Sequence, residues 1–125
     1  MQRSKTLQSS PIATGGLGYV FENNVKTAFI SLMLIEAIPP ISYSGRIEKI
    51  NFQTNSLGYH TDDMLITISD ENQIESKLIC SIKMNISFTN SNKEFQEVFQ
   101  SAWKDYHNKK LCSQNDKLCT CYRFA

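Results

Sequence analysis

Acidic and basic side chains lie close to two consecutive apolar runs in the middle of the chain. Asp62 and Asp63 open the first run, and the second run contains Ser81 and Lys83, two positions apart. Alternate residues of a strand point to the same face, so Ser81 and Lys83 share one. A lysine in an apolar strand is costly to bury alone, and the two acids are its natural partners if the runs pair as a hairpin. One interpretation is that an acid and Lys83 form a structural ion pair at the end of the sheet. The other is that the acids bind a cation and that the Lys83 ammonium beside it binds an anion.

The elements that must position these groups begin with a helix. Residues 17–36 carry apolar side chains at helical spacing, including Ala28 and Ile35, and Pro39-Pro40 ends the segment. Short segments rich in apolar and β-branched residues then predict three strands, separated by turn and loop residues. Because the strands are short and consecutive, we expect an antiparallel meander formed by residues 45–54, 63–69 and 77–87.

A second helix and a further strand complete the expected fold. Ser91 and Glu94 have the spacing of a capping box, and an apolar stripe follows them. Trp103 flanks that stripe and is predicted to be a core side chain, while residues 117–124 could form a last short strand. A helix at each end of the meander must cover the faces of the sheet. The predicted fold class is therefore α/β, a small sandwich of helix, three-strand meander, helix and strand.

Composition limits the class of protein. The chain has 125 residues, of which 41% are hydrophobic, so one globular domain is expected. A net charge of +1 gives no global basic field for nucleic acid. Residues 1–16 are predicted to be a flexible arm and lack the apolar core of a signal peptide. Without a secretory signal or a membrane-length apolar run, we expect a cytoplasmic protein with reduced thiols and no membrane partner.

Two further groups of residues could carry chemistry. The four residues His107, Cys112, Cys119 and Cys121 are zinc ligand types, although their spacing matches no common zinc knuckle. His60 stands beside Asp62 and could act as a base or contact DNA, while a solvated loop histidine is the plainer interpretation. Cys80 lies in the apolar strand without an evident basic neighbour to activate it.

A set of segments, in order along the chain, carries a family resemblance. The segments are Gly16-Leu17-Gly18-Tyr19-Val20-Phe21-Glu22, Phe52-Gln53-Thr54, Gly58-Tyr59 followed by Asp62-Asp63, and Ala102-Trp103-Lys104-Asp105-Tyr106. The chain resembles the PD-(D/E)xK nuclease superfamily, and more closely the double-stranded-DNA nuclease domain that precedes an NTPase and sensor region in bacterial anti-phage proteins of the STAND NTPase type. The resemblance implies a restriction-endonuclease-like core over residues 17–118, with residues 119–125 as a short tail or truncated continuation.

The resemblance also implies a site. In that superfamily an acid opens the second strand, as Asp63 does, and the third strand carries Glu or Gln, any residue, then Lys, where this chain has Ser81-Ile82-Lys83. A glutamate on the first helix often joins the site, and Glu22 fits that place. The implied cofactor is Mg²⁺ or Mn²⁺, held by Asp63, Glu22 and the backbone carbonyl of Ile82. Lys83 would orient the attacking water or stabilise phosphate charge.

The expected function is accordingly a metal-dependent deoxyribonuclease that hydrolyses phosphodiester bonds of double-stranded DNA with little sequence preference. Phosphates would be contacted by exposed lysines, with Lys93, Lys104, Lys109 and Lys110 as candidates. Ser81 departs from the family pattern, because a hydroxyl is a poor ligand for a hard cation. The alternative is therefore a catalytically inactive remnant that binds DNA or a partner chain. A structural module that forms a homo-oligomer is the third hypothesis.

Overall fold

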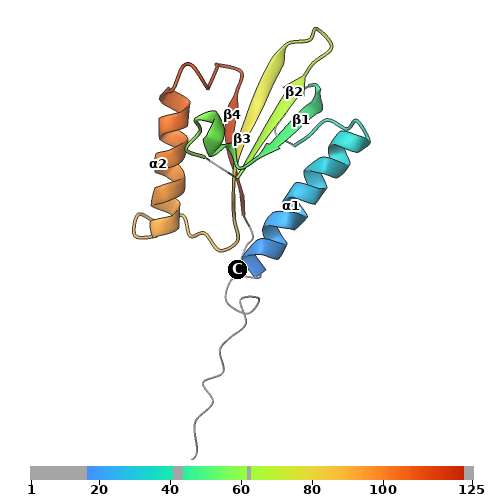
Figure 1. The fold of residues 1–125 in the computed structure, drawn as a ribbon. Helices are drawn as coiled ribbons and strands as arrows, with labels where there is room; N and C mark the ends of the chain where they lie inside the picture. Colours follow the sequence, from blue (N-terminus) through green and yellow to red (C-terminus); the bar gives the residue numbers. More distant parts are fainter. Residues whose placement is uncertain (1–16, 41–43, 62, 123–125) are drawn as a thin grey trace, which may run out of the picture.

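The computed structural model describes residues 17–40, 44–61 and 63–122 (Figure 1). The expected arm and Asp62 lie outside these residues. Helices and strands follow one another in the predicted order, with one additional short 3-10 helix. They are α1 (Leu17–Leu34), β1 (Arg46–Phe52), η2 (Thr54–Leu57), β2 (Met64–Ser69), β3 (Glu75–Lys83), α2 (Lys93–His107) and β4 (Lys117–Tyr122).

The strands form one mixed sheet in the order β1-β2-β3-β4. β1 with β2 and β2 with β3 pair antiparallel, which confirms the predicted meander. β4 returns parallel to β3, with Leu78 opposite Lys117 and Lys83 opposite Tyr122. A parallel return requires a long crossover, and α2 provides it. The last predicted strand is thus confirmed in its described part, and it includes residues 119–122, which were assigned to a tail.

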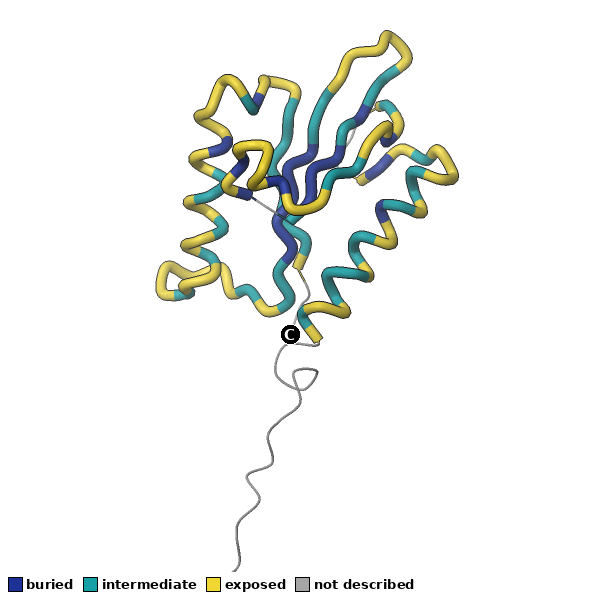
Figure 2. The backbone as a smooth tube through the Cα atoms, viewed as in Figure 1, coloured by how far each residue is buried: buried dark blue, intermediate teal, exposed yellow. Residues whose placement is uncertain are grey.

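The two faces of the sheet have separate cores because strand side chains alternate. On one face, buried residues of β1, β2 and β3 pack with Phe29 of α1, around Met64, Ile66 and Cys80. On the other face, a smaller cluster joins Tyr59, Leu65, Ile79 and Cys112. Figure 1 shows α1 and α2 on opposite sides of the sheet, and Figure 2 shows the buried backbone concentrated in its central strands. The fold is therefore a three-layer α/β sandwich.

Several helix predictions are wrong in detail. Ile35 is 72% exposed and lies beyond the end of α1, and Ala28 is exposed as well. Glu36 has a φ of 55°, and the Ala37 amide donates to the Leu32 carbonyl, so the chain has left the helix before Pro39-Pro40. The first helix therefore ends in a left-handed turn, and the prolines follow it.

Corrections also apply to α2. Its N-cap is Asn92, whose side chain accepts a hydrogen bond from the Phe95 amide at 2.8 Å, so Ser91 is not the cap. Trp103 is 58% exposed and belongs to a row of aromatic rings along the solvent side, with Phe95 and Phe99. Asp105 is the one buried residue of α2, so a polar contact helps to fix the position of this helix.

The main polar contact is made by Asp105, whose side chain is fully buried in α2. Its two carboxylate oxygens accept hydrogen bonds from the backbone amides of His60 and Thr61, each at 2.7 Å. Thr54 adds a bond from its hydroxyl to the Thr61 carbonyl at 2.8 Å. These contacts fix the segment that leads into β2, and with it the place of Asp63.

Lys77 forms a second polar tether on the same face. Its ammonium donates to the Tyr59 hydroxyl at 3.1 Å and to the Leu111 carbonyl at 2.7 Å, and Asp116 lies 3.7 Å away. Burial lowers the pKa of Lys77, but the hydrogen bond to Tyr59 and the nearby acids outweigh it, so the net pKa is raised. Lys77 therefore joins β3 to the segments before β2 and before β4.

We predict that Asp105→Ala lowers the free energy of unfolding by roughly 2–4 kcal/mol, because two amides lose a charged acceptor in a buried place. Asp105→Asn keeps one acceptor oxygen and should cost less. Urea denaturation followed by circular dichroism measures both. Glu97→Ala, an exposed change in the same helix, is the control and should stay within about 0.5 kcal/mol of the parent. Equal stability of Asp105→Ala and the parent would contradict the tether.

Candidate functional site

Asp63 stands immediately before β2, where the ladder between β2 and β3 ends. The last pair at this end is Met64 with Cys80, while β3 runs on beside β4 as far as Lys83. The Oδ2 atom of Asp63 accepts a hydrogen bond from the Ile82 amide at 2.7 Å and lies 3.4 Å from the Ser81 hydroxyl. The carboxylate thus takes the place of a strand carbonyl that β2 no longer supplies.

Ser81 and Lys83 share the face of β3 that carries Ile79, as the alternation of the strand requires. Ser81 is 7% exposed and Lys83 is half-buried. In the part of the chain that the structure describes, no ion pair joins Asp63 to Lys83, so the structural ion pair expected for them is not formed. Asp62, the other expected partner, lies outside the described residues. The structure therefore brings Asp63, Ser81 and Ile82 together and places Lys83 next along the strand.

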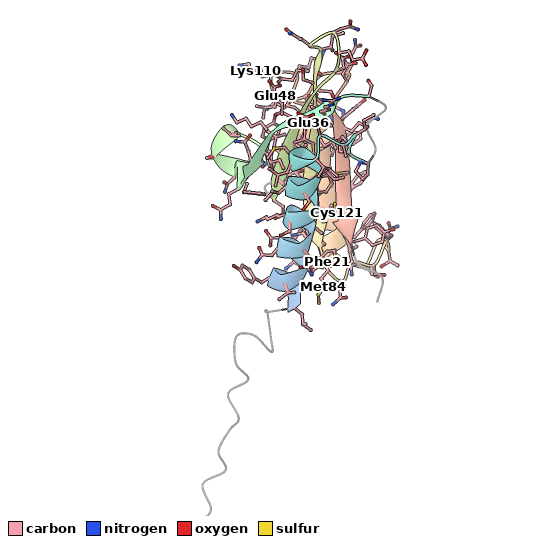
Figure 3. The ribbon with its side chains drawn as sticks, turned by 90° about the vertical axis from the view of Figure 1, so that its right-hand side faces the viewer. Phe21, Glu36, Glu48, Met84, Lys110 and Cys121 are labelled. Carbon is pink, nitrogen blue, oxygen red and sulfur yellow. The ribbon has the colours of Figure 1, made fainter. Side chains whose placement is uncertain are left out.

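Glu22 belongs to the other layer. Its carboxylate pairs with Lys26 at 2.8 Å, and the Lys26 ammonium lies 4.9 Å from the ring centre of Phe52. Phe52 is opposite Met64 in the sheet, so Glu22 stands at the same end as Asp63. Figure 3 likewise shows Phe21 at the start of α1 near Met84 after β3. However, α1 packs on the face opposite to Ser81 and Lys83, so Glu22 is engaged with Lys26 on the far side of the sheet.

A small cavity of about 70 Å³ lies beside Ser81, between α2 and the sheet. Thr61 lines it, and its buried Oγ1 has no hydrogen-bond partner in the structure. The lining is mostly apolar, but the hydroxyls of Thr61, Ser81 and Thr120 also face it and could hold an ordered water. A small cavity with three hydroxyl-bearing residues therefore lies under α2, beside Ser81.

Sequence reasoning missed the residue that positions this region, Asp105. Its signal was present, because Asp105 continues the helical stripe of Val98 and Ala102, where an apolar residue is expected. A charge in that place indicates a buried polar contact. The partners, His60 and Thr61, contribute only backbone amides, so no side-chain pattern could reveal them.

The alternative zinc ligands do not assemble. Cys112 packs in the cluster on the α2 face, whereas Cys119 and Cys121 pack on the α1 face. The Nδ1 atom of His107 lies 2.8 Å from the Trp103 carbonyl. Within residues 17–40, 44–61 and 63–122, no group of three or more His, Cys, Asp or Glu side chains is arranged to hold a metal ion. His60 is exposed and contributes its backbone amide to Asp105.

The thiols on the α1 face influence one another. Hydrogen bonds with Cys119 and Cys121, together with burial, raise the pKa of Cys80. Hydrogen bonds with Cys119 and Cys80 lower the pKa of Cys121 and outweigh its burial. Cys112, alone on the other face, has its pKa raised mainly by burial. Cys80, which lacked any evident activating neighbour in the sequence, therefore has two thiol neighbours in the fold.

Oxygen atoms near Asp63 fit a magnesium ion in part. A strand residue presents its N–H and C=O to the same side, so the Ile82 carbonyl is on the side of Asp63 as well. Asp63, Ile82 and the Ser81 hydroxyl are all oxygen donors, the type that Mg²⁺ prefers. Mg²⁺ is often held by one or two carboxylates, with waters and substrate phosphates as further ligands. The donor set fits such a one-carboxylate site, and Glu22 is paired with Lys26 on the other face of the sheet.

No family model, curated protein or solved structure matches the chain. Neither of the two described α-helices has the length and apolar character needed to cross a membrane. What the site can do therefore has to follow from its own residues.

We predict that Asp63→Ala destabilises the end of β3, whereas Asp63→Asn largely preserves it. Alanine removes the acceptor of the Ile82 amide, at a cost of about 1–3 kcal/mol, and asparagine retains a carbonyl oxygen there. Hydrogen exchange of the Ile82 amide, measured by NMR, is the sharpest readout. Unchanged exchange in Asp63→Ala would show that this hydrogen bond does not hold the strand end.

Proposed function

We propose that the chain is a metal-dependent DNA endonuclease domain of the PD-(D/E)xK type. The observation that carries the proposal is the hydrogen bond that the Ile82 amide donates to the Asp63 carboxylate, which joins the start of β2 to the strand that bears Lys83. The order of helix, three-strand meander, helix and parallel strand is compatible with a restriction-endonuclease-like core. Asp63 and Lys83, the two residues that match the acid and the lysine of the family pattern, lie at the same end of the sheet.

Most of the expected site residues have a role in this proposal. The Asp63 carboxylate and the Ile82 carbonyl would hold Mg²⁺ or Mn²⁺, which when bound supplies positive charge for the phosphate and acidifies water. Lys83 orients the attacking water and stabilises charge on the phosphate. The Ser81 hydroxyl, beside Asp63 and the small cavity, positions a water. Glu22, the second expected ligand, is paired with Lys26 on the other face of the sheet and is given no role in this arrangement.

Double-stranded DNA is the proposed substrate, contacted mainly through its phosphates. Exposed lysines lie at the start of α2, within it and directly after it, namely Lys93, Lys104, Lys109 and Lys110. The sequence contains no segment that resembles a base-reading helix, so low sequence specificity is part of the proposal. A cytoplasmic anti-phage role follows from the family resemblance alone.

A second candidate function has its own observation. The Oδ2 atom of Asp63 already accepts a hydrogen bond from Ile82, and a serine stands where the family has a carboxylate or amide. A carboxylate that accepts a backbone hydrogen bond can have a purely structural role, without binding a metal ion. The second candidate is therefore an inactive nuclease-like module that binds DNA, or a partner chain, without cleaving it.

Plasmid cleavage with Mg²⁺ or Mn²⁺ against EDTA tests the first candidate. We expect Asp63→Asn and Lys83→Met to lower the rate by about 10²-fold or more, because the first weakens the proposed metal site and the second removes a cation at the phosphate. Lys49→Met, an exposed lysine of β1, is the matched control and should cleave like the parent. Absence of cleavage together with a DNA mobility shift would favour the inactive module. Absence of both would contradict both DNA functions.

Ser81→Glu tests the metal site apart from catalysis. A second carboxylate beside Asp63 adds an oxygen ligand and, without metal, a like-charge repulsion. Its melting temperature should therefore rise more on addition of Mg²⁺ than that of the parent, because only the folded state holds the site. Ser81→Gln has the same size without the charge and should respond like the parent. Equal responses of the Glu and Gln variants would exclude a metal ion at this position.

A further inference from the structure

Three of the four cysteines gather on the face of the sheet that α1 covers. Cys80 lies on β3 and is fully buried, and Cys119 and Cys121 lie on β4 and pack against the same apolar cluster. Cys80 and Cys119 are opposite each other in the parallel register of the two strands. Their sulfur atoms are 2.7 Å apart. Figure 3 looks onto the α1 side of the sheet and labels Cys121 of β4 there.

This placement meets the requirements of a disulfide. Neighbouring strands are separated by about 4.8 Å, which falls within the Cα separation of about 4.4–6.8 Å that disulfides span. The two sulfurs already face each other, so no strand has to move far. Cys112, the remaining cysteine, lies across the sheet with Tyr59 and Leu65 and has no thiol neighbour there.

We propose that Cys80 and Cys119 form a site of reversible oxidation by peroxide. The two thiols and one hydrogen peroxide give one disulfide and two waters: both S–H bonds and the O–O bond break, and one S–S bond forms. Each sulfur loses one electron, and the peroxide takes up two electrons and two protons. A dithiol such as dithiothreitol reverses the step by exchange.

The disulfide would fasten the edge strand to the centre of the sheet. β4 is the last strand of the sheet and follows α2, so a link between positions 39 apart encloses the whole crossover. Closing a ring of that length lowers the conformational entropy of the unfolded chain, and this raises the free energy of unfolding. The link lies on the α1 face, away from Ser81 and Lys83, and so does not depend on the proposed nuclease activity.

The full chain, reduced and then desalted, is treated with hydrogen peroxide, blocked with N-ethylmaleimide and digested with trypsin without reductant. Cleavage after Lys77, Lys83, Lys117 and Arg123 places Cys80 and Cys112 in separate peptides and leaves Cys119 and Cys121 together in a third. The expected product is Leu78–Lys83 joined to Leu118–Arg123, with Cys112 recovered as the maleimide adduct. The melting temperature should rise by several degrees on oxidation and should fall back to that of the reduced chain after treatment with dithiothreitol.

Two variants show which cysteine of β4 is joined to Cys80. Cys121→Ser should still give the linked peptides, and Cys119→Ser should lose them. Oxidation in concentrated urea is the control for folding, and there Cys112 should join the mixture of disulfides. The proposal is overturned if the folded chain gives no link between the two peptides, if Cys112 is linked as often as Cys119, or if the link survives in Cys119→Ser and disappears in Cys121→Ser.

Discussion

A buried carboxylate on α2 fixes the part of the molecule on which the candidate site depends. Asp105 has no exposed surface, and its two oxygens accept hydrogen bonds from consecutive amides of His60 and Thr61. A buried charge is costly unless it is fully hydrogen-bonded, and paired amides in the right orientation satisfy it. Most aromatic side chains of α2 are exposed and Asp105 is its one buried residue, so this contact helps to hold the helix against the sheet. It also sets the path of the chain into Asp63.

Structure and chemistry make competing demands on Asp63. The carboxylate closes the open end of the β2–β3 ladder by accepting the Ile82 amide, and the same oxygen atoms are the proposed ligands of a cation. A ligand that already has a hydrogen bond is held in one orientation, which favours a precise site but leaves fewer lone pairs for the metal. The serine at position 81 relieves the like-charge repulsion that a second acid would bring. Asp63 therefore has a hydrogen-bonding role that needs no metal ion, a feature compatible with either proposed function.

Much of the fold follows from local patterns in the sequence, and the errors have identifiable causes. The meander could be predicted because Met64 to Ser69 and Leu78 to Lys83 are rich in apolar and β-branched residues and are separated by polar loop residues. The prediction that Trp103 is buried is wrong, because apolar character alone does not tell which side of a short amphipathic helix is covered. The N-cap was misplaced by one residue, since Ser91 and Asn92 are both good caps. The Asp63–Ile82 bond could not be predicted, because it depends on where one ladder stops and the next continues.

The row of exposed aromatic rings on α2 has a spectroscopic consequence. Trp103 is the single tryptophan of the chain, and it stacks on Phe99 at a centroid distance of 6.2 Å while remaining 58% exposed. An indole in that environment is already hydrated in the native state, so its emission should change little when the sheet unfolds. Its fluorescence should instead be sensitive to anything that covers the outer side of α2. The protein thus carries a built-in optical reporter of contacts at that surface.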